Sequence, residues 1–364
     1  MTEADLPALT HRLLWAAFVL GLGFGAIAQR THFCTMGAVA DLVHMGDSTR
    51  ARMWALAVAV AMLGFNGMVA LGWVRAGSSL YAGSTLLWLS HLVGGLMFGV
   101  GMVLASGCGS KTLVRIGGGN LKSLVVFGVM AVTAFATLRG LTAFARVRWL
   151  DAVHLTLPAG QDLPSLLARA SGGSVPRLAL GLGLVLGGGL LAWSLASAEA
   201  RRPGVLLGGL GSGAVVLVAW WVSGVMGYLP EHPETLEPTF LATASQRMEA
   251  ISFVGPVAAG MEWLVFFSDT SRHLSLGVAA VIGNPAASVA VLLGWVYIVE
   301  NTIALIPHGY SIQGYMPFLN GVYGTGQEIV VMPPWGINGA LAYCAAVSVV
   351  LFTIACCAAY LGRR

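Results

Sequence analysis

The sequence predicts an all-α polytopic membrane protein of about nine transmembrane helices, with short broken or re-entrant helices and an internal repeat. Of its 364 residues, 57% are hydrophobic and only 9% are charged, whereas roughly 25% of the residues of a soluble domain are charged. The mean hydropathy is +0.81, so most of the surface must face a solvent other than water. A soluble fold is therefore excluded, and a lipid bilayer is the expected solvent.

Nine stretches between charged residues are long and apolar enough to become spanning helices, because a helix needs roughly 20 residues to cross the hydrocarbon core. In chain order they are 13–29, 53–74, 76–110, 123–138, 178–198, 203–228, 250–267, 274–299 and 337–361. We interpret residues 1–364 as one transmembrane domain. Its parts are a first cysteine-bearing half (10–142), a loop (143–177), a second half (178–280) and an atypical C-terminal segment (281–364).

Basic residues in short loops predict the orientation of these helices, since such loops stay in the cytoplasm. The expected cytoplasmic loops hold Arg50 and Arg52, then Lys111, Arg115 and Lys122, then Arg201 and Arg202, and the chain ends in Arg363 and Arg364. The loop 229–246 holds three glutamates and no Arg or Lys. This alternation predicts a cytoplasmic C-terminus and leaves the side of the N-terminus open. The net charge of +4 is small and scattered, which argues against a nucleic-acid partner.

Two apolar, glycine-rich segments each lead to a cysteine. Gly21-Leu-Gly-Phe-Gly25 precedes Cys34 by nine positions, and Gly95-Leu-Met-Phe-Gly99 precedes Cys108 by nine positions. We interpret the pair as a repeat in which a helix runs into a break that carries one thiol. The alternative is coincidence, because 49 glycines produce such matches easily.

Broken helices inside a membrane use their freed backbone N–H groups to hold ions. Gly107 and Gly109 are expected to take positive φ values and to bring N–H groups, with Ser110, close to an anion. A thiol is a weak, polarisable donor that suits a soft sulfur acceptor, so Cys34 and Cys108 are the predicted contacts for a sulfur-bearing anion. The competing interpretation treats both cysteines as small packing residues.

Basic residues flank both breaks. Arg30, Lys111 and Arg115 are predicted to attract anions, or alternatively to anchor the helices on the cytoplasmic side. No metal site is expected, because one histidine and one cysteine at His32 and Cys34 are too few ligands. Ser110 stands where a phosphate loop needs glycine, so no nucleotide cofactor is expected either.

The residues around both cysteines resemble signatures of the YeeE/YedE family of sulfur-compound (thiosulfate) transporters. These are Gln29-Arg-Thr-His-Phe-Cys34-Thr-Met-Gly-Ala-Val-Ala-Asp41 and the stretch 101–120, and residues 219–224 and 249–256 resemble the family's second half. The resemblance covers about residues 10–280. It implies a carrier in the bacterial inner membrane, not an enzyme, in which cysteine thiols relay thiosulfate by S–H to sulfur hydrogen bonds.

The C-terminal segment departs from this pattern. The family's later Gly-Cys thiol motif does not follow Gly283. Instead Trp295-Val-Tyr-Ile-Val-Glu300-Asn and Met332-Pro-Pro-Trp335 resemble the C-terminal end of ABC exporter permeases. Of the later cysteines, Cys344 is interpreted as a packing residue and Cys356 and Cys357 as lipid- or helix-facing.

Three functions follow from these observations. The first is uptake of thiosulfate or a related sulfur anion. The second is sulfur transfer, in which one thiol forms a persulfide for a cytoplasmic sulfurtransferase. The third is a transport-defective carrier with an altered C-terminus. Two further titratable residues, His91 and Glu262, are interpreted as a helix-end histidine and a structural carboxylate near the cytoplasmic end, with proton shuttling and ion coupling as their alternatives.

Overall fold

A computed structural model describes residues 5–233, 235–266 and 274–283, together with isolated residues between 334 and 346. The chain divides into two compact units, residues 1–288 and 289–364. In the second unit the ring of Trp335 stacks on that of Tyr343, with centroids 5.3 Å apart. The helices and strands named below all belong to the first unit.

The described chain is almost entirely helical. Its α-helices are α1 (Asp5–Thr31), α2 (Thr35–Ala40), α3 (Thr49–Ala70), α4 (Trp88–Leu104), α5 (Gly109–Gly117), α6 (Leu121–Arg139), α7 (Leu141–Ala145), α8 (Leu163–Ser171), α9 (Val175–Leu182), α10 (Gly188–Leu195), α11 (Pro203–Trp221), α12 (Val254–Val265) and α13 (Leu276–Gly283). Two antiparallel two-residue pairings complete it, β1 (Thr85–Leu86) with β2 (Leu155–Thr156) and β3 (Tyr228–Leu229) with β4 (Thr239–Phe240).

The all-α polytopic membrane fold is confirmed. Six stretches in the described part of the chain are long and apolar enough to cross a bilayer. They are Asp5–Met45, Thr49–Ala70, Trp88–Gly117, Leu121–Arg139, Val175–Leu195 and Pro203–Met226. They correspond to the first six predicted spans.

The remaining predicted spans have different outcomes. The seventh, 250–267, forms only the 12-residue helix α12, which is too short to cross the core alone. The eighth is described only over α13, and the ninth lies almost wholly outside the described residues. The third predicted span began too early, because residues 76–87 form turns and β1 before α4 starts at Trp88. The predicted count of nine is therefore not confirmed.

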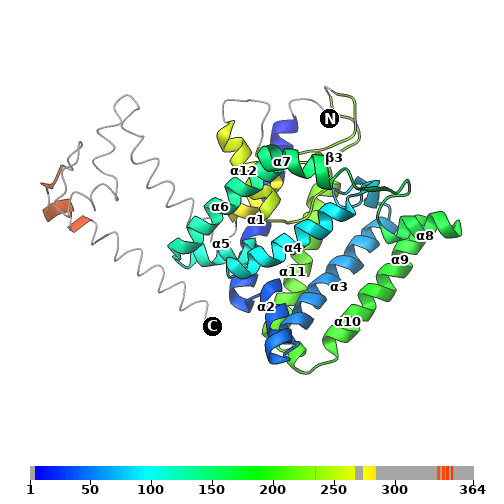
Figure 1. Cartoon of the computed structure of the whole chain (residues 1–364), viewed down its shortest axis with the longest axis horizontal. Coiled ribbons are helices and arrows are strands. Elements are labelled where there is room, and N and C mark those ends of the chain that lie inside the picture. Colours follow the sequence, from blue (N-terminus) through cyan, green and yellow to red (C-terminus); the bar gives the residue numbers. More distant parts are fainter. Residues whose placement is uncertain are drawn as a thin grey trace. The chain divides into compact units, whose positions relative to one another are not determined.

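Helix α3 packs against α11 and against the α9–α10 pair, and α1 packs against α11 and α13. Figure 1 shows α3 between α11 and the α9–α10 pair. Glycines allow these close approaches, as is usual between membrane helices. A Cβ atom on Gly213 of α11 would lie 2.7 Å from the Ala57 carbonyl oxygen and 2.7 Å from the Val60 Cβ.

We therefore expect Gly213→Ala to destabilise the protein by about 1–3 kcal/mol, the usual cost of overpacking a tight contact. Thermal unfolding of the detergent-solubilised full chain measures this effect. Gly189→Ala in α10 is the matched control, because a Cβ there would meet no atom within 4 Å. Equal midpoints for the two variants would contradict the packing described.

Helices α4 and α6 present most of their apolar side chains outward. No residue of α4 is buried, and Leu104 is 81% exposed. In α6 only Ser123 and Ala131 are buried. In a membrane protein such surfaces face lipid, so α4 and α6 lie at the periphery of the described unit.

Helix ends and loops that were predicted to lie on the same side of the membrane contact each other in the structure. At one end, Arg52 donates a hydrogen bond to the carbonyl oxygen of Trp193 and its guanidinium lies 4.6 Å from the centre of that indole ring. At the other end, β1 pairs with β2, and the Leu80 N–H donates to the Met248 carbonyl oxygen at 3.0 Å. The first end carries the basic loops, and the second carries the loops expected outside the cytoplasm.

Glu262 lies at the second of these ends. Its carboxylate pairs with Arg139 at 3.5 Å, and Arg139 ends α6, whereas Lys122 stands at the start of that helix. The expectation that Glu262 lies near the cytoplasmic end is thus wrong, because α12 runs beside α6 and brings it to the opposite end. His91 lies in the first turn of α4, as expected for a helix-end histidine.

Candidate functional site

Each predicted cysteine stands at a helix break of the same form. Helix α1 ends at Thr31 and Cys34 caps the start of α2, whereas α4 ends at Leu104 and Cys108 caps the start of α5. Two residues before each cysteine the backbone is left-handed, with φ of 53° at His32 and 56° at Ser106. The shared geometry supports the internal repeat.

The second break is closed by backbone hydrogen bonds. The Gly107 N–H donates to the Met102 carbonyl oxygen at 2.9 Å, and the Ser106 N–H donates to the Val103 carbonyl oxygen at 3.1 Å. These two bonds satisfy the carbonyl groups at the end of α4. The prediction that Gly107 and Gly109 take positive φ values is wrong, because Ser106 takes the left-handed position instead.

The two glycines instead make room for neighbouring side chains. A Cβ on Gly107 would lie 3.0 Å from Cδ of Lys111, and a Cβ on Gly109 would lie 3.2 Å from Cβ of Phe253. The Cβ of Lys111 also lies 3.2 Å from a Cβ on Gly107, so both positions have a close contact that is fixed by the backbone. Gly107 meets the adjacent helix α5, whereas Gly109 meets the distant segment that carries Phe253.

The two cysteines meet in space although they are far apart in the sequence. The Cys34 and Cys108 side chains lie close enough to influence each other, and both are free thiols. Cys34 is 8% exposed, and its Sγ accepts a hydrogen bond from the Gly37 N–H at 3.5 Å. The Sγ of Cys108 lies 3.2 Å from the Ser110 hydroxyl oxygen. Three of the predicted site residues, Cys34, Cys108 and Ser110, thus lie together.

Contact between the two thiols predicts that they can be cross-linked. Treating the full chain with diamide, which takes one hydrogen from each thiol and is reduced to the hydrazine, should join Cys34 to Cys108 in a disulfide. Peptide mass spectrometry with and without reducing agent measures the product. Cys34→Ser is the control that cannot form it, and failure of the wild type to cross-link would refute the contact.

The predicted basic residues are placed unequally around the thiols. Lys111, in the first turn of α5, is near enough for its charge to act on Cys34. Arg115 follows Cys108 by seven residues, which is about 10 Å along a helix, and Arg30 lies in the last turn of α1. Lys111 is therefore the basic residue that the structure brings to the thiol pair.

Arg50 is a neighbour of the site that the sequence did not indicate. It forms an ion pair with the buried Asp41 at 3.2 Å. Its Nη1 atom would lie 2.9 Å from a Cβ on Gly37, the residue whose N–H contacts Cys34. Arg50 thus supports the backbone of the first break.

Aromatic rings line the site beside the thiols. Phe24 of α1 lies 5.4 Å from Phe253 and 6.3 Å from Phe33, measured between ring centroids. Phe253 belongs to the segment 249–256, which resembled the family's second half. That resemblance was the only signal in the sequence for this contact, because no local pattern links residue 253 to residue 109.

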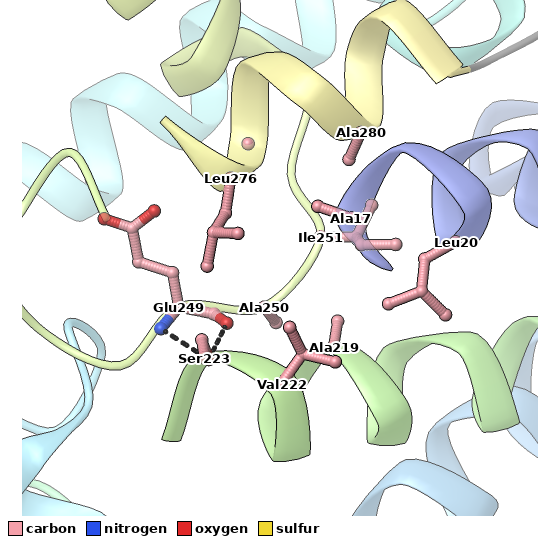
Figure 2. Close-up of a pocket in the computed structure, with 11 residues that line it drawn as sticks. Ala17, Leu20, Ala219, Val222, Ser223, Glu249, Ala250, Ile251, Leu276 and Ala280 are labelled. Carbon is pink, nitrogen blue, oxygen red and sulfur yellow. Dashed lines mark hydrogen bonds between the residues drawn. The ribbon is translucent and has the colours of Figure 1, made fainter. Parts of the chain in front are cut away.

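A separate small cavity lies beside the segment around Glu249. The cavity measures about 30 Å³ and is lined by residues of α1, α11, α13 and the segment 249–251. Figure 2 shows the backbone of Glu249 facing Ser223 beside this cavity. The Ser223 hydroxyl donates to the Glu249 carbonyl oxygen at 2.6 Å. A space of this size holds about one or two water molecules. The hydrogen bond from Ser223 beside it anchors the segment that carries Phe253.

The family model described as Sulphur transport matches residues 30–294, which include both cysteine breaks and the Phe253 segment. The chain belongs to this family. The match ends near the start of the predicted atypical segment, whose resemblance to ABC exporter permeases stays a prediction.

Two thiosulfate transporters are similar to part of the chain. TsuA of Escherichia coli (strain K12) is 30% identical over 123 residues, covering 34% of this chain and 34% of that protein. TsuA of Spirochaeta thermophila is 27% identical over 128 residues, covering 35% and 37%. The probable transporter YedE of Salmonella typhimurium is 33% identical over 112 residues, covering 31% and 26%. The matched part thus spans about a third or less of the length of each relative.

Proposed function

We propose that this protein takes up thiosulfate or a related sulfur-containing anion across the bacterial inner membrane, with its C-terminus in the cytoplasm. The observation that carries the proposal is the contact between Cys34 and Cys108 where two helices are broken. Membership of the sulphur transport family and similarity to thiosulfate transporters support the same function.

Neutral thiols suit this substrate. The terminal sulfur of thiosulfate is a large, polarisable acceptor, and an S–H group is a weak, polarisable donor. Hydrogen bonds to a charged acceptor strengthen where water is excluded. The pair therefore distinguishes thiosulfate from sulfate, which offers only hard oxygen atoms.

The proximity of the two thiols favours one anion-binding site that contains both of them over two separate binding sites. Because the thiols contact each other, one anion can be held by both at once. The Ser110 hydroxyl beside Cys108 and the ammonium of Lys111 are the further groups available to the sulfonate end. The anion then passes from one thiol to the other without losing all its contacts.

Uptake into proteoliposomes that contain the intact chain tests the proposal. We expect saturable uptake of ³⁵S-thiosulfate that excess unlabelled thiosulfate abolishes and an equal concentration of sulfate reduces only weakly. Empty vesicles are the first control, and the second is a chain whose residues 281–364 are replaced by a family-like end. Binding without uptake in the intact chain, restored by that replacement, would indicate the transport-defective alternative.

Mass spectrometry of the cysteine peptides during turnover tests the sulfur-transfer alternative. We expect Cys34 and Cys108 to stay unmodified, because a carrier needs no chemical step. A gain of one sulfur atom on either thiol, removed when a cytoplasmic sulfurtransferase is added, would instead favour the persulfide function.

A further inference from the structure

A polar cavity lies apart from the thiols, at the end of the protein where β1 pairs with β2. Its volume is about 490 Å³, which is within the range of small-ligand sites. The loop between α3 and α4, the loop before α8 and the segment after β4 all contribute to it. Its polar lining residues include Tyr81, Ser84, Thr85, His91, Gln161 and Arg247.

Arg247 supplies positive charge to this cavity. Arg247 is an exposed residue, and within the described part of the chain its guanidinium donates only to the Ser79 carbonyl oxygen, at 3.5 Å. Among the residues that the structure describes, no carboxylate forms an ion pair with it. A guanidinium with free donors is the side chain best suited to bind an oxyanion through two parallel hydrogen bonds.

A second donor lies next to this guanidinium. A Cβ on Gly83 would lie 3.4 Å from Nη1 of Arg247 and 4.0 Å from Nε2 of Gln161. Gln161 donates to the Thr85 carbonyl oxygen at 2.8 Å, which fixes its amide. The glycine therefore leaves open the space where two donor groups converge, and His91 stands at the rim in the first turn of α4.

We infer that this cavity is an oxyanion capture site, in which Arg247 and Gln161 bind the sulfonate oxygens of a sulfur anion before it reaches the thiols. The direction of travel rests on the proposed function. Binding in the cavity depends on charge and oxygen acceptors, so sulfate should occupy it as well as thiosulfate does. The thiol pair alone would then discriminate thiosulfate from sulfate.

Neighbouring residues lead from the cavity toward the thiols. The side chains of Tyr81 and Ser252 lie close enough to influence each other, and the next residue, Phe253, lies against Gly109. Burial, together with the charge of Glu249, raises the pKa of Tyr81. The phenol therefore stays protonated and remains a donor on the inner wall of the cavity.

Equilibrium binding of ³⁵S-sulfate to the full chain in nanodiscs, at low ionic strength, tests the capture site. We expect Arg247→Gln to weaken sulfate binding by at least about tenfold, the loss of one charged contact. Arg247→Lys should retain part of the affinity. Arg169→Gln, which removes an exposed charge from α8, is the matched control.

Several results would overturn the inference. Wild-type affinity in Arg247→Gln, an equal loss in Arg169→Gln, or absence of sulfate binding by the wild type would each do so. The size-exclusion profile of each variant reports its folding. If Arg247→Gln alone loses sulfate binding while both cysteine variants still take up thiosulfate, the thiol function fails and the capture site stands.

Discussion

Cys108→Ser is expected to lower the initial rate of thiosulfate uptake by at least about tenfold, and Cys34→Ser by a similar factor. Serine keeps a donor of nearly the same size but replaces a polarisable thiol with a hard hydroxyl, so the contact to sulfur is weakened. A tenfold change corresponds to about 1.4 kcal/mol, which is within the range of one hydrogen bond to a charged group. Uptake by proteoliposomes matched for protein content measures it.

The double variant tests whether both thiols hold the same anion. Residues that act on one ligand as a unit show non-additive effects, so Cys34→Ser with Cys108→Ser should be little worse than either single variant. Cys356→Ser is the matched control, because it removes a thiol to which the proposal gives no role. Undiminished uptake in both single variants would remove the thiols from the mechanism.

Gly109→Ala is expected to lower uptake by about tenfold while Gly101→Ala leaves it within about twofold. The new Cβ at residue 109 would lie 3.2 Å from Cβ of Phe253, an atom that cannot rotate away. Phe253 must then move by a few tenths of an ångström away from the residue that follows Cys108, and small displacements at a functional site cost large factors in rate. At residue 101 of α4 a new Cβ would meet no atom within 4 Å, so that variant adds a methyl group without displacing a neighbour.

The same uptake assay compares the two glycine variants, and thermal unfolding separates loss of function from loss of fold. Gly109→Ala should unfold within a few degrees of the wild type, because the contact lies at a helix start outside the tight α3–α11 packing. Equal uptake by the two variants would show that Phe253 does not shape the site.

The sequence predicted the helices best where charges bound an apolar stretch. Arg30, Arg52, Arg75 and Arg139 each stand near the end of a helix or the start of a loop, and six spans followed from this pattern. It failed over 250–267, where composition alone suggested a span and α12 has only 12 residues. Hydropathy measures which solvent a segment prefers, whereas the length of the helix depends on the backbone at Phe253 and Phe266.

The sequence indicated the two cysteines at helix breaks but not the geometry of those breaks. The repeated spacing identified Cys34 and Cys108, but the left-handed positions fell to His32 and Ser106 instead of glycine. That choice depends on hydrogen bonds that close the end of α4, which residue type alone does not determine. The contacts of Phe253 and Arg50 join distant parts of the chain, so no local pattern could have indicated them.

The proposed transport through two neutral thiols would have an electrical consequence. An anion held only by S–H groups would cross without a matching counter-charge from them, and Lys111 is near enough for its charge to act on Cys34. With the cell interior negative, each unit of negative charge moved inward works against about 2.3 kcal/mol per 100 mV. A dianion therefore accumulates only if metabolism removes it promptly on arrival or if cations travel with it, and imposing a potential on sealed vesicles would reveal which.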